Sequence, residues 1–201
     1  DRAIYINGDN NQILGCYIGV DITGTTSGGY TQTGIYMTAN YFNNKIGDGT
    51  AAGVNLISGN EGAGATTGMG IYITASMQLT TIKGNIIGLQ KNGITNVASA
   101  SGAFQRYGVY VSSGSNTIGG TVAGEGNVLS GNDVAGILID GSSNLVYGNR
   151  IGTAADGLSL TSVADKQDYG IQFLTGAGTT VGGDITTNAR NIISGNGLYG
   201  V

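Results

Sequence analysis

Residues 127–139, NVLSGNDVAGILI, carry the pattern that decides the fold. A short apolar run, Val128-Leu129, is followed by a Ser-Gly-Asn turn and then by Gly136–Ile139, in which apolar residues flank a variable one. Alternation with a period of two is typical of a strand with one buried face, and Gly, Asn and Ser are the residues that tight turns need. The stretch therefore predicts short strands joined by tight turns.

The second of these runs recurs along the whole chain as a small residue followed by an apolar, a variable and an apolar residue. The copies, called anchor segments below, are Ala3–Ile6, Gly34–Met37, Gly70–Ile73, Gly108–Val111, Gly136–Ile139 and Gly170–Phe173, and a seventh begins at Gly200-Val201. Two kinds of connecting sequence alternate between them. One kind contains Asn127–Asn132 and Asn191–Asn196, and the other contains Gly84–Gly88 and Gly148–Gly152. The repeat is therefore a pair of anchor segments.

The length of this double repeat is nearly constant. Equivalent isoleucines are 67 residues apart between Ile4 and Ile71 (71 − 4) and 66 apart between Ile71 and Ile137 (137 − 71). A copy of Asp1 placed directly after Val201 would give 68 (201 − 137 + 4). We expect one β-solenoid domain over residues 1–201, made of double-rung repeats at approximately 1–67, 68–134 and 135–201 and uncapped at both ends.

These features predict an all-β fold, a right-handed parallel β-helix of about six rungs, because three short strands per turn recur at a fixed column. At about 4.8 Å per rung, six rungs form a rod of roughly 29 Å. Strand alternation predicts which anchor residues line the interior. They are Ile4, Ile6, Ile35, Met37, Ile71, Ile73, Val109, Val111, Ile137, Ile139, Ile171 and Phe173.

Four segments also carry a family resemblance. Asn116–Gly120, Asn127–Asn132, Gly136–Ile139 and Gly148–Thr153 resemble the right-handed parallel β-helix repeats of large bacterial cell-surface and secreted proteins. The resemblance implies the solenoid fold and an extracellular or cell-surface location. It does not select a function, since the same solenoid carries lyases, hydrolases, tailspikes, adhesins and stalks.

Composition excludes several classes of protein. The chain has 39 Gly, no Pro, no His, no Trp and one Cys, and 40% of its residues are apolar against 10% charged. It is too apolar for disorder and lacks the proline of collagen and the paired cysteines of a disulfide scaffold. A net charge of −4 leaves no basic face for nucleic acid, and no apolar run is long enough for membrane insertion.

Two sets of side chains recur at fixed columns. Asparagines at one position of alternate rungs predict structural ladders, with a row of sugar-binding amides as the alternative; they are Asn55, Asn127 and Asn191, and Asn60, Asn132 and Asn196. Cys16 stands where Asn85 and Asn149 stand later, so we expect a small buried replacement, with a thiol that joins two chains as the alternative. The outward anchor position reads Tyr5, Tyr36, Tyr72 and Tyr110, an exterior aromatic strip. Mutual packing of the rings is one interpretation of this strip, and contact with a sugar chain or a second rod is the other.

Nothing in the sequence favours an enzyme. The acids are scattered over different corners, no histidine can act as a base or a metal ligand, and we expect no catalytic residue, cofactor or metal. If the protein were an enzyme, Asp140 with Arg150 and Lys83 would be the least unfavourable catalytic cluster. The long connections Val20–Thr33, Leu89–Tyr107 and Thr153–Tyr169 are expected to emerge on one side as solvated decoration, with surface recognition as the alternative.

The sequence therefore predicts a structural extracellular β-solenoid, a subunit or segment of a fibre or stalk that assembles head to tail with itself by rung stacking. The first alternative is a glycan-binding adhesin or tailspike-like segment whose partner is a surface polysaccharide. A polysaccharide lyase or hydrolase is a more distant one.

Overall fold

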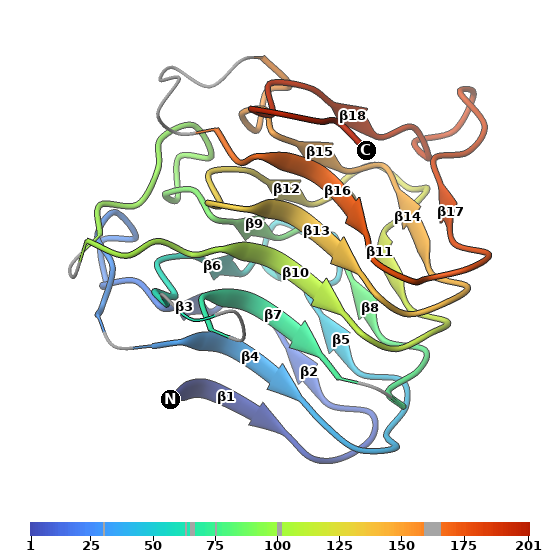
Figure 1. The fold of residues 1–201 in the computed structure, drawn as a ribbon, viewed down its shortest axis with the longest axis horizontal. Helices are drawn as coiled ribbons and strands as arrows, with labels where there is room; N and C mark the ends of the chain where they lie inside the picture. Colours follow the sequence, from blue (N-terminus) through green and yellow to red (C-terminus); the bar gives the residue numbers. More distant parts are fainter. Residues whose placement is uncertain (30, 63, 65–66, 75, 100–101, 159–165) are drawn as a thin grey trace.

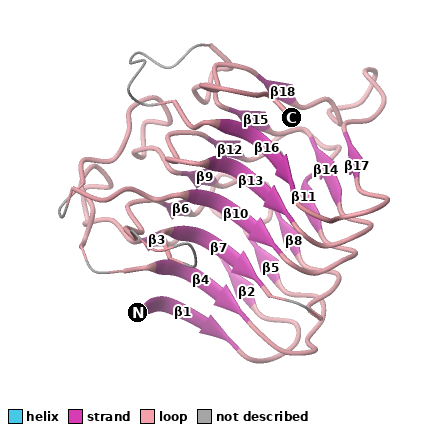
Figure 2. Cartoon of the chain, in the orientation of Figure 1, coloured by secondary structure: helices cyan, strands magenta, loops and turns pink. Residues whose placement is uncertain are grey.

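The protein is a stack of short parallel strands. The computed structural model describes residues 1–29, 31–62, 64, 67–74, 76–99, 102–158 and 166–201. The described residues form strands and turns and contain no helix (Figure 2). Their strands make three parallel six-stranded sheets that rise rung by rung from the N-terminal to the C-terminal end (Figure 1). The predicted right-handed parallel β-helix is confirmed.

Each rung contributes one strand to each sheet. The first sheet contains β1 (Arg2–Ile6), β4 (Thr33–Met37), β7 (Met69–Ile73), β10 (Tyr107–Val111), β13 (Ala135–Ile139) and β16 (Tyr169–Phe173). The second contains β2 (Gln12–Ile13), β5 (Lys45–Ile46), β8 (Thr81–Ile82), β11 (Thr117–Gly119), β14 (Leu145–Tyr147) and β17 (Thr180–Val181). The third contains β3 (Tyr17–Ile18), β6 (Leu56–Ile57), β9 (Ile86–Ile87), β12 (Val128–Leu129), β15 (Arg150–Ile151) and β18 (Ile192–Ile193). The five-residue strands of the first sheet are the anchor segments found in the sequence.

The register of the first sheet keeps equivalent residues in one column. Ile4, Ile35, Ile71, Val109, Ile137 and Ile171 pair in succession. Above them, Tyr199 pairs with Tyr169, and the N–H of Ile171 donates to the carbonyl of Gly200 (2.9 Å). Val201 therefore already occupies the seventh anchor position. The third double repeat therefore spans 64 residues, from Ile137 to Val201 (201 − 137). The value of 68, which assumed that a copy of Asp1 follows Val201, does not describe the observed ladder.

The interior is a continuous column of aliphatic side chains. Ten of the twelve residues predicted to line it are buried, which confirms the inward face of the anchor strands. Ile4, on the first rung, is only partly buried and packs against this core. The prediction is wrong for Phe173, which is 38% exposed. Tyr199 and Gly200 lie over the start of β16 and leave the end of that strand, where Phe173 lies, without a covering strand.

Glycine begins the anchor segments for a steric reason. A Cβ atom on Gly70 would lie 2.6 Å from the carbonyl oxygen of Gly108 on the next rung, and one on Gly108 would lie 2.5 Å from that of Gly136. Real Cβ atoms do not approach a backbone oxygen this closely. The close approach of successive rungs therefore requires the recurring small residue of the anchor pattern.

Candidate functional site

The first amide ladder runs up the corner between the second and third sheets. Each side chain donates from Nδ2 to Oδ1 of the next rung: Asn55 to Asn85 (2.8 Å), Asn85 to Asn127 (2.9 Å), Asn127 to Asn149 (2.9 Å) and Asn149 to Asn191 (3.1 Å). The sequence pattern placed Asn55, Asn127 and Asn191 on alternate rungs. The structure brings them together in one unbroken column, because Asn85 and Asn149 fill the rungs between.

The second amide ladder lies at the corner that leads back to the first sheet. Asn60, Asn132 and Asn196 do not touch one another, since Gln105 and Gln167 stand between them. The four amide–amide bonds are 2.8 to 3.0 Å long. Sequence reasoning missed both glutamines because the two long connections precede them. The sequence feature that could have revealed them is their constant spacing, because each glutamine stands two residues before the tyrosine, Tyr107 or Tyr169, that begins the next anchor strand.

A third column, at the corner between the first and second sheets, was not predicted. Asn11 donates to Oδ1 of Asn44 from its backbone N–H (2.9 Å), and Asn116 donates in the same way to Asn144 (3.0 Å). Thr80 interrupts this column: the Nδ2 atom of Asn44 and the Oγ1 atom of Thr80 are buried without a hydrogen-bond partner. The interior thus has polar ladders at all three corners around an aliphatic core.

Cys16 forms the lower end of the first amide ladder, in the column expected from the sequence. Its backbone N–H donates to Oδ1 of Asn55 (2.9 Å), and its Sγ lies 3.2 Å from the carbonyl oxygen of Leu14. The side chain is half-buried, not fully buried as expected, because Cys16 belongs to the first rung.

The exterior tyrosines form one column on the outer face of the first sheet. Tyr5 and Tyr36 stack with ring centroids 5.7 Å apart, Tyr36 and Tyr72 meet edge to face at 5.4 Å, and Tyr72 and Tyr110 stack at 4.8 Å. The guanidinium of Arg2 lies 3.6 Å from the centre of the Tyr36 ring. Partial burial raises the pKa of Tyr72. Neighbouring rings and the Arg2 guanidinium pack against the ring faces. The strip therefore presents mainly ring edges and hydroxyl groups to solvent.

The three long connections stack on one another along one side of the rod (Figure 1). The N–H of Lys91 donates to the carbonyl of Gly24 (3.0 Å), and that of Ala155 donates to Gly93 (2.7 Å). Residues 159–165 of the third connection lie outside the described residues. The described parts of these connections are thus bound to one another by backbone hydrogen bonds and are not merely solvated loops.

The acidic side chains mostly cap their own turns. The hydrogen bond from the Thr23 hydroxyl, together with those from the backbone N–H groups of Thr25 and Thr26, lowers the pKa of Asp21 and outweighs the opposing effect of desolvation. Asp48 and Asp184 are held in the same way, by Thr50 and Thr186, and their pKa values are also lowered. Within the described residues, no three His, Cys, Asp or Glu side chains gather as metal ligands.

The cluster that could have been forced into a catalytic role is not brought together. Asp140 follows β13 at the end of the first sheet and accepts a hydrogen bond from Thr175. Lys83 lies between the second and third sheets and pairs with Glu125 (2.7 Å), while Arg150 begins β15 in the third sheet. Asp140 and Lys83 thus engage different partners, and the three side chains lie in different parts of the rung.

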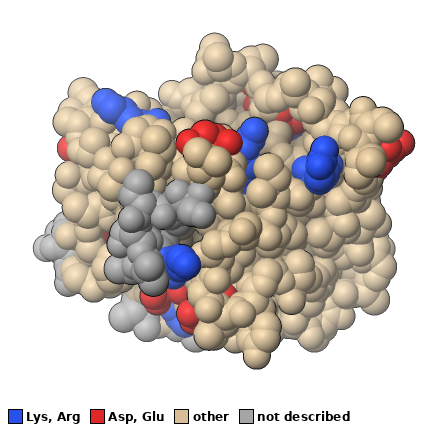
Figure 3. Space-filling view, turned by 90° about the horizontal axis from the view of Figure 1, so that it is seen from above, with Lys and Arg blue, Asp and Glu red and all other residues tan. Residues whose placement is uncertain are grey.

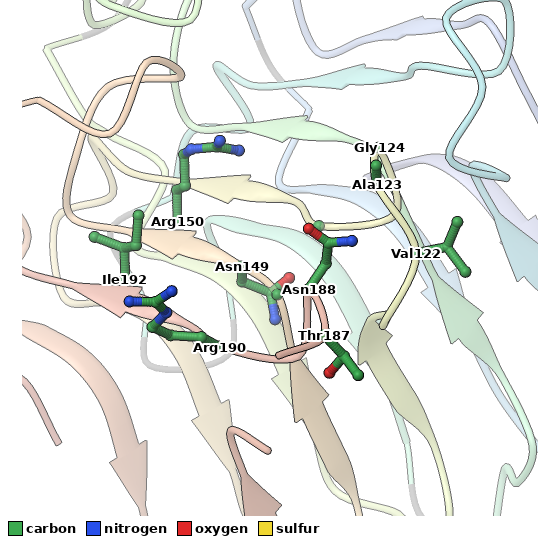
Figure 4. Close-up of a pocket in the computed structure, with 11 residues that line it drawn as sticks. Val122, Ala123, Gly124, Asn149, Arg150, Thr187, Asn188, Arg190 and Ile192 are labelled. Carbon is green, nitrogen blue, oxygen red and sulfur yellow. The ribbon is translucent and has the colours of Figure 1, made fainter. Parts of the chain in front are cut away.

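A groove that the sequence analysis missed opens on the outside of the upper rungs (Figure 4). The β14–β15 connection is only Gly148-Asn149, whereas the connections before β12 and before β18 are longer and project beyond it. The recess has a volume of about 450 Å³. Its lining includes Val122, Arg150, Thr187, Asn188, Arg190 and Ile192, and we call it the arginine groove.

Comparisons of the chain with family models, with curated proteins and with solved structures found no match. None of the described residues belongs to a helix that could span a membrane.

Proposed function

We propose that the chain is a structural β-solenoid of the cell surface or extracellular space, extended by further rungs that stack on its end strands. The further rungs belong to a second copy joined head to tail or to a longer array of the same repeats. The proposal rests chiefly on one atom. Nδ2 of Asn196, at the upper end of the second amide ladder, is buried and has no hydrogen-bond partner.

The only hydrogen-bond partner that the Asn196 side chain lacks in this ladder is an acceptor for Nδ2, which a further rung could supply. In this ladder, Asn60, Gln105, Asn132 and Gln167 each donate to the amide oxygen of the next rung, and Asn196 accepts from Gln167. An amide oxygen one rung higher would therefore complete the series. A buried donor without an acceptor is costly, so stacking is favoured there.

The upper end also exposes apolar side chains. Five large side chains of the last rung and of the segment above it are between 38% and 64% exposed: Phe173, Leu174, Leu198, Tyr199 and Val201. Seen from this end, most of the visible surface carries no charged side chain (Figure 3). Burial of these apolar groups would favour a stacked rung, with little charge repulsion against it.

Sedimentation velocity over a wide concentration series, with negative-stain microscopy, tests the proposal. We expect the chain to form end-to-end oligomers. Association should be slow, because β1 of a second copy has to displace Tyr199 and Gly200 from β16. Leu198→Glu with Val201→Glu should abolish it, whereas Ile22→Glu, on a side chain 94% exposed in a lateral loop, should not. A chain that stays monomeric at every concentration, or one that associates equally well with the end charges, would contradict the proposal.

A further inference from the structure

The arginine groove lies where an ion pair of one double repeat is replaced by uncharged residues in the next. On the third and fourth rungs, the N–H of Gly84 donates to the carbonyl of Glu125 (2.9 Å), and the Glu125 side chain pairs with Lys83. Two rungs higher, the N–H of Gly148 donates to the carbonyl of Ala189 (3.1 Å). Ala189 therefore stands in the place of Glu125, and Tyr147 stands in the place of Lys83.

Two cations border this position without the acid. Arg190 follows Ala189 and is exposed, and Arg150 is half-buried at the start of β15. Arg150 pairs with Val128 below and Ile192 above, in a column that is apolar on the neighbouring rungs. Its Nε atom is buried and has no hydrogen-bond partner. A guanidinium in an apolar column with an unused N–H is a group that still lacks an acceptor.

The carboxylates on the surrounding turns are already engaged. Glu125 is held by Lys83, Asp184 accepts the N–H of Thr186 (2.8 Å), and Asp156 accepts the N–H of Leu158 (2.9 Å). Within the part of the chain that the structure describes, Lys83–Glu125 is the only ion pair. The positive charge of the groove is therefore not neutralised from within this part of the protein.

We propose that the arginine groove binds a carboxylate-bearing carbohydrate, with the carboxylate at the exposed guanidinium of Arg190 and with Arg150, on the other side of Ile192, adding positive charge (Figure 4). The planar guanidinium fork matches a carboxylate. Thr187 and Asn188 on one wall offer hydroxyl and amide groups to sugar hydroxyls, and the exposed side chain of Ile192, beside the two arginines, offers an apolar contact to the ring C–H face (Figure 4). The groove volume lies within the range of small-molecule sites.

Isothermal titration calorimetry with glucuronate, glucose and inorganic sulfate tests this proposal. Glucuronate should bind at least roughly tenfold more tightly than glucose, since a charged hydrogen bond is worth about this factor or more. Sulfate should bind more weakly than glucuronate, because it lacks the hydroxyl and ring contacts. Sulfate binding as tight as glucuronate binding would overturn the carbohydrate assignment, and no preference for glucuronate over glucose would overturn the arginine contacts.

Variants place the binding in the groove. Arg190→Gln removes an exposed side chain and should leave the fold intact while weakening glucuronate roughly tenfold. Arg150→Gln should also weaken it, but to a smaller extent, because this side chain adds charge and not a direct contact. Arg2→Gln, at the opposite end of the rod, is the matched control and should leave the affinity unchanged. Circular dichroism verifies folding of each variant, and an unchanged affinity in folded Arg190→Gln protein would overturn the proposal.

Discussion

At the scale of single residues, the interior amides give the rod a direction. Every amide–amide bond of the first two ladders runs from the Nδ2 or Nε2 atom of one rung to the oxygen of the rung above it. Within a ladder each amide therefore pairs with the amides of the adjacent rungs, and a missing member leaves buried polar atoms of its neighbours without partners. Thr80 is the place where a column lacks a member, and it carries the first prediction.

Thr80→Asn should stabilise the protein. An amide at this position can accept from Nδ2 of Asn44 and continue the third column toward Asn116, whereas Thr80 leaves two buried atoms without partners. We expect a gain of about 1 kcal/mol in the free energy of unfolding, measured by urea denaturation. Thr80→Val is the matched control and should be close to neutral, because the hydroxyl that it removes has no partner. A loss of stability in the asparagine variant would contradict this account.

The Lys83–Glu125 pair should make stability depend on pH below the ordinary carboxyl range. Partial burial acts to raise the pKa of Glu125, but the hydrogen bond and charge of Lys83 and a backbone N–H outweigh it, and the pKa is held below its usual 4.5. A folded pKa below the unfolded one means that the contribution is present above about pH 4.5 and is lost as the pH falls further.

Comparison of Glu125→Gln with wild type measures this contribution. Both side chains are partly exposed, and a partly exposed ion pair contributes about 0.5 to 1 kcal/mol. Urea unfolding should therefore separate the two proteins by this amount at pH 6 and by less at pH 3. Lys83→Gln should behave in the same way. An equal difference at both pH values would exclude the ion pair as its source.

At the scale of the strand, the anchor segments were predictable because two constraints coincide there. Alternation exposes the tyrosines and buries the isoleucines, while the approach of the next rung demands a small residue at the start. Both leave a local signature in the sequence. The two-residue strands of the second and third sheets leave less, and only their flanking Gly and Asn residues marked them.

Gly70→Ala tests the steric part of this explanation. The added methyl group would lie 2.6 Å from the carbonyl oxygen of Gly108, so the first sheet must open or shift. We expect a loss of about 1 to 3 kcal/mol in the free energy of unfolding, the usual cost of overpacking. Gly28→Ala is the control, since its methyl group would meet nothing closer than 3.7 Å and its φ is not positive. Comparable losses in both variants would show that space between rungs is not the cause.

The candidate functional features were harder to predict than the strands, for a physical reason. A column of stacked side chains can be recognised in the sequence only when the same residue type recurs in it. The asparagines were therefore found, and the glutamines that alternate with them were not. The arginine groove depends on unequal loop lengths and on Arg150 and Arg190, which come from different rungs. Neither residue repeats, and periodicity carries no information about a feature that occurs once.

At the scale of the whole molecule, each rung contacts mainly its neighbours, so an internal double rung should be removable. Deletion of residues 71–136 joins Gly70 to Ile137, which shares the column of Ile71. It also places Asn55 below Asn149 and Asn60 below Gln167, so both amide ladders stay continuous. The shortened chain should fold, with a β-type circular dichroism spectrum and a smaller urea m-value because less surface is buried.

A deletion that ignores the columns is the matched control. Removal of residues 71–120 joins an anchor strand to a turn and should give an aggregated or unfolded chain. If both shortened proteins fold equally well, the column register does not determine the fold.

The interrung hydrogen bonds all run along the rod axis, and this has a mechanical consequence. A force applied through the two chain ends loads one rung at a time, so the bonds of that rung break before those of the next are strained. The molecule should then lengthen in steps, each releasing one rung of 28 to 38 residues between equivalent anchor strands. At about 3.4 Å per extended residue, each step adds on the order of 100 Å of contour length. Under tension, the fold would thus lengthen rung by rung, and each rung that unfolds would dissipate part of the applied mechanical work.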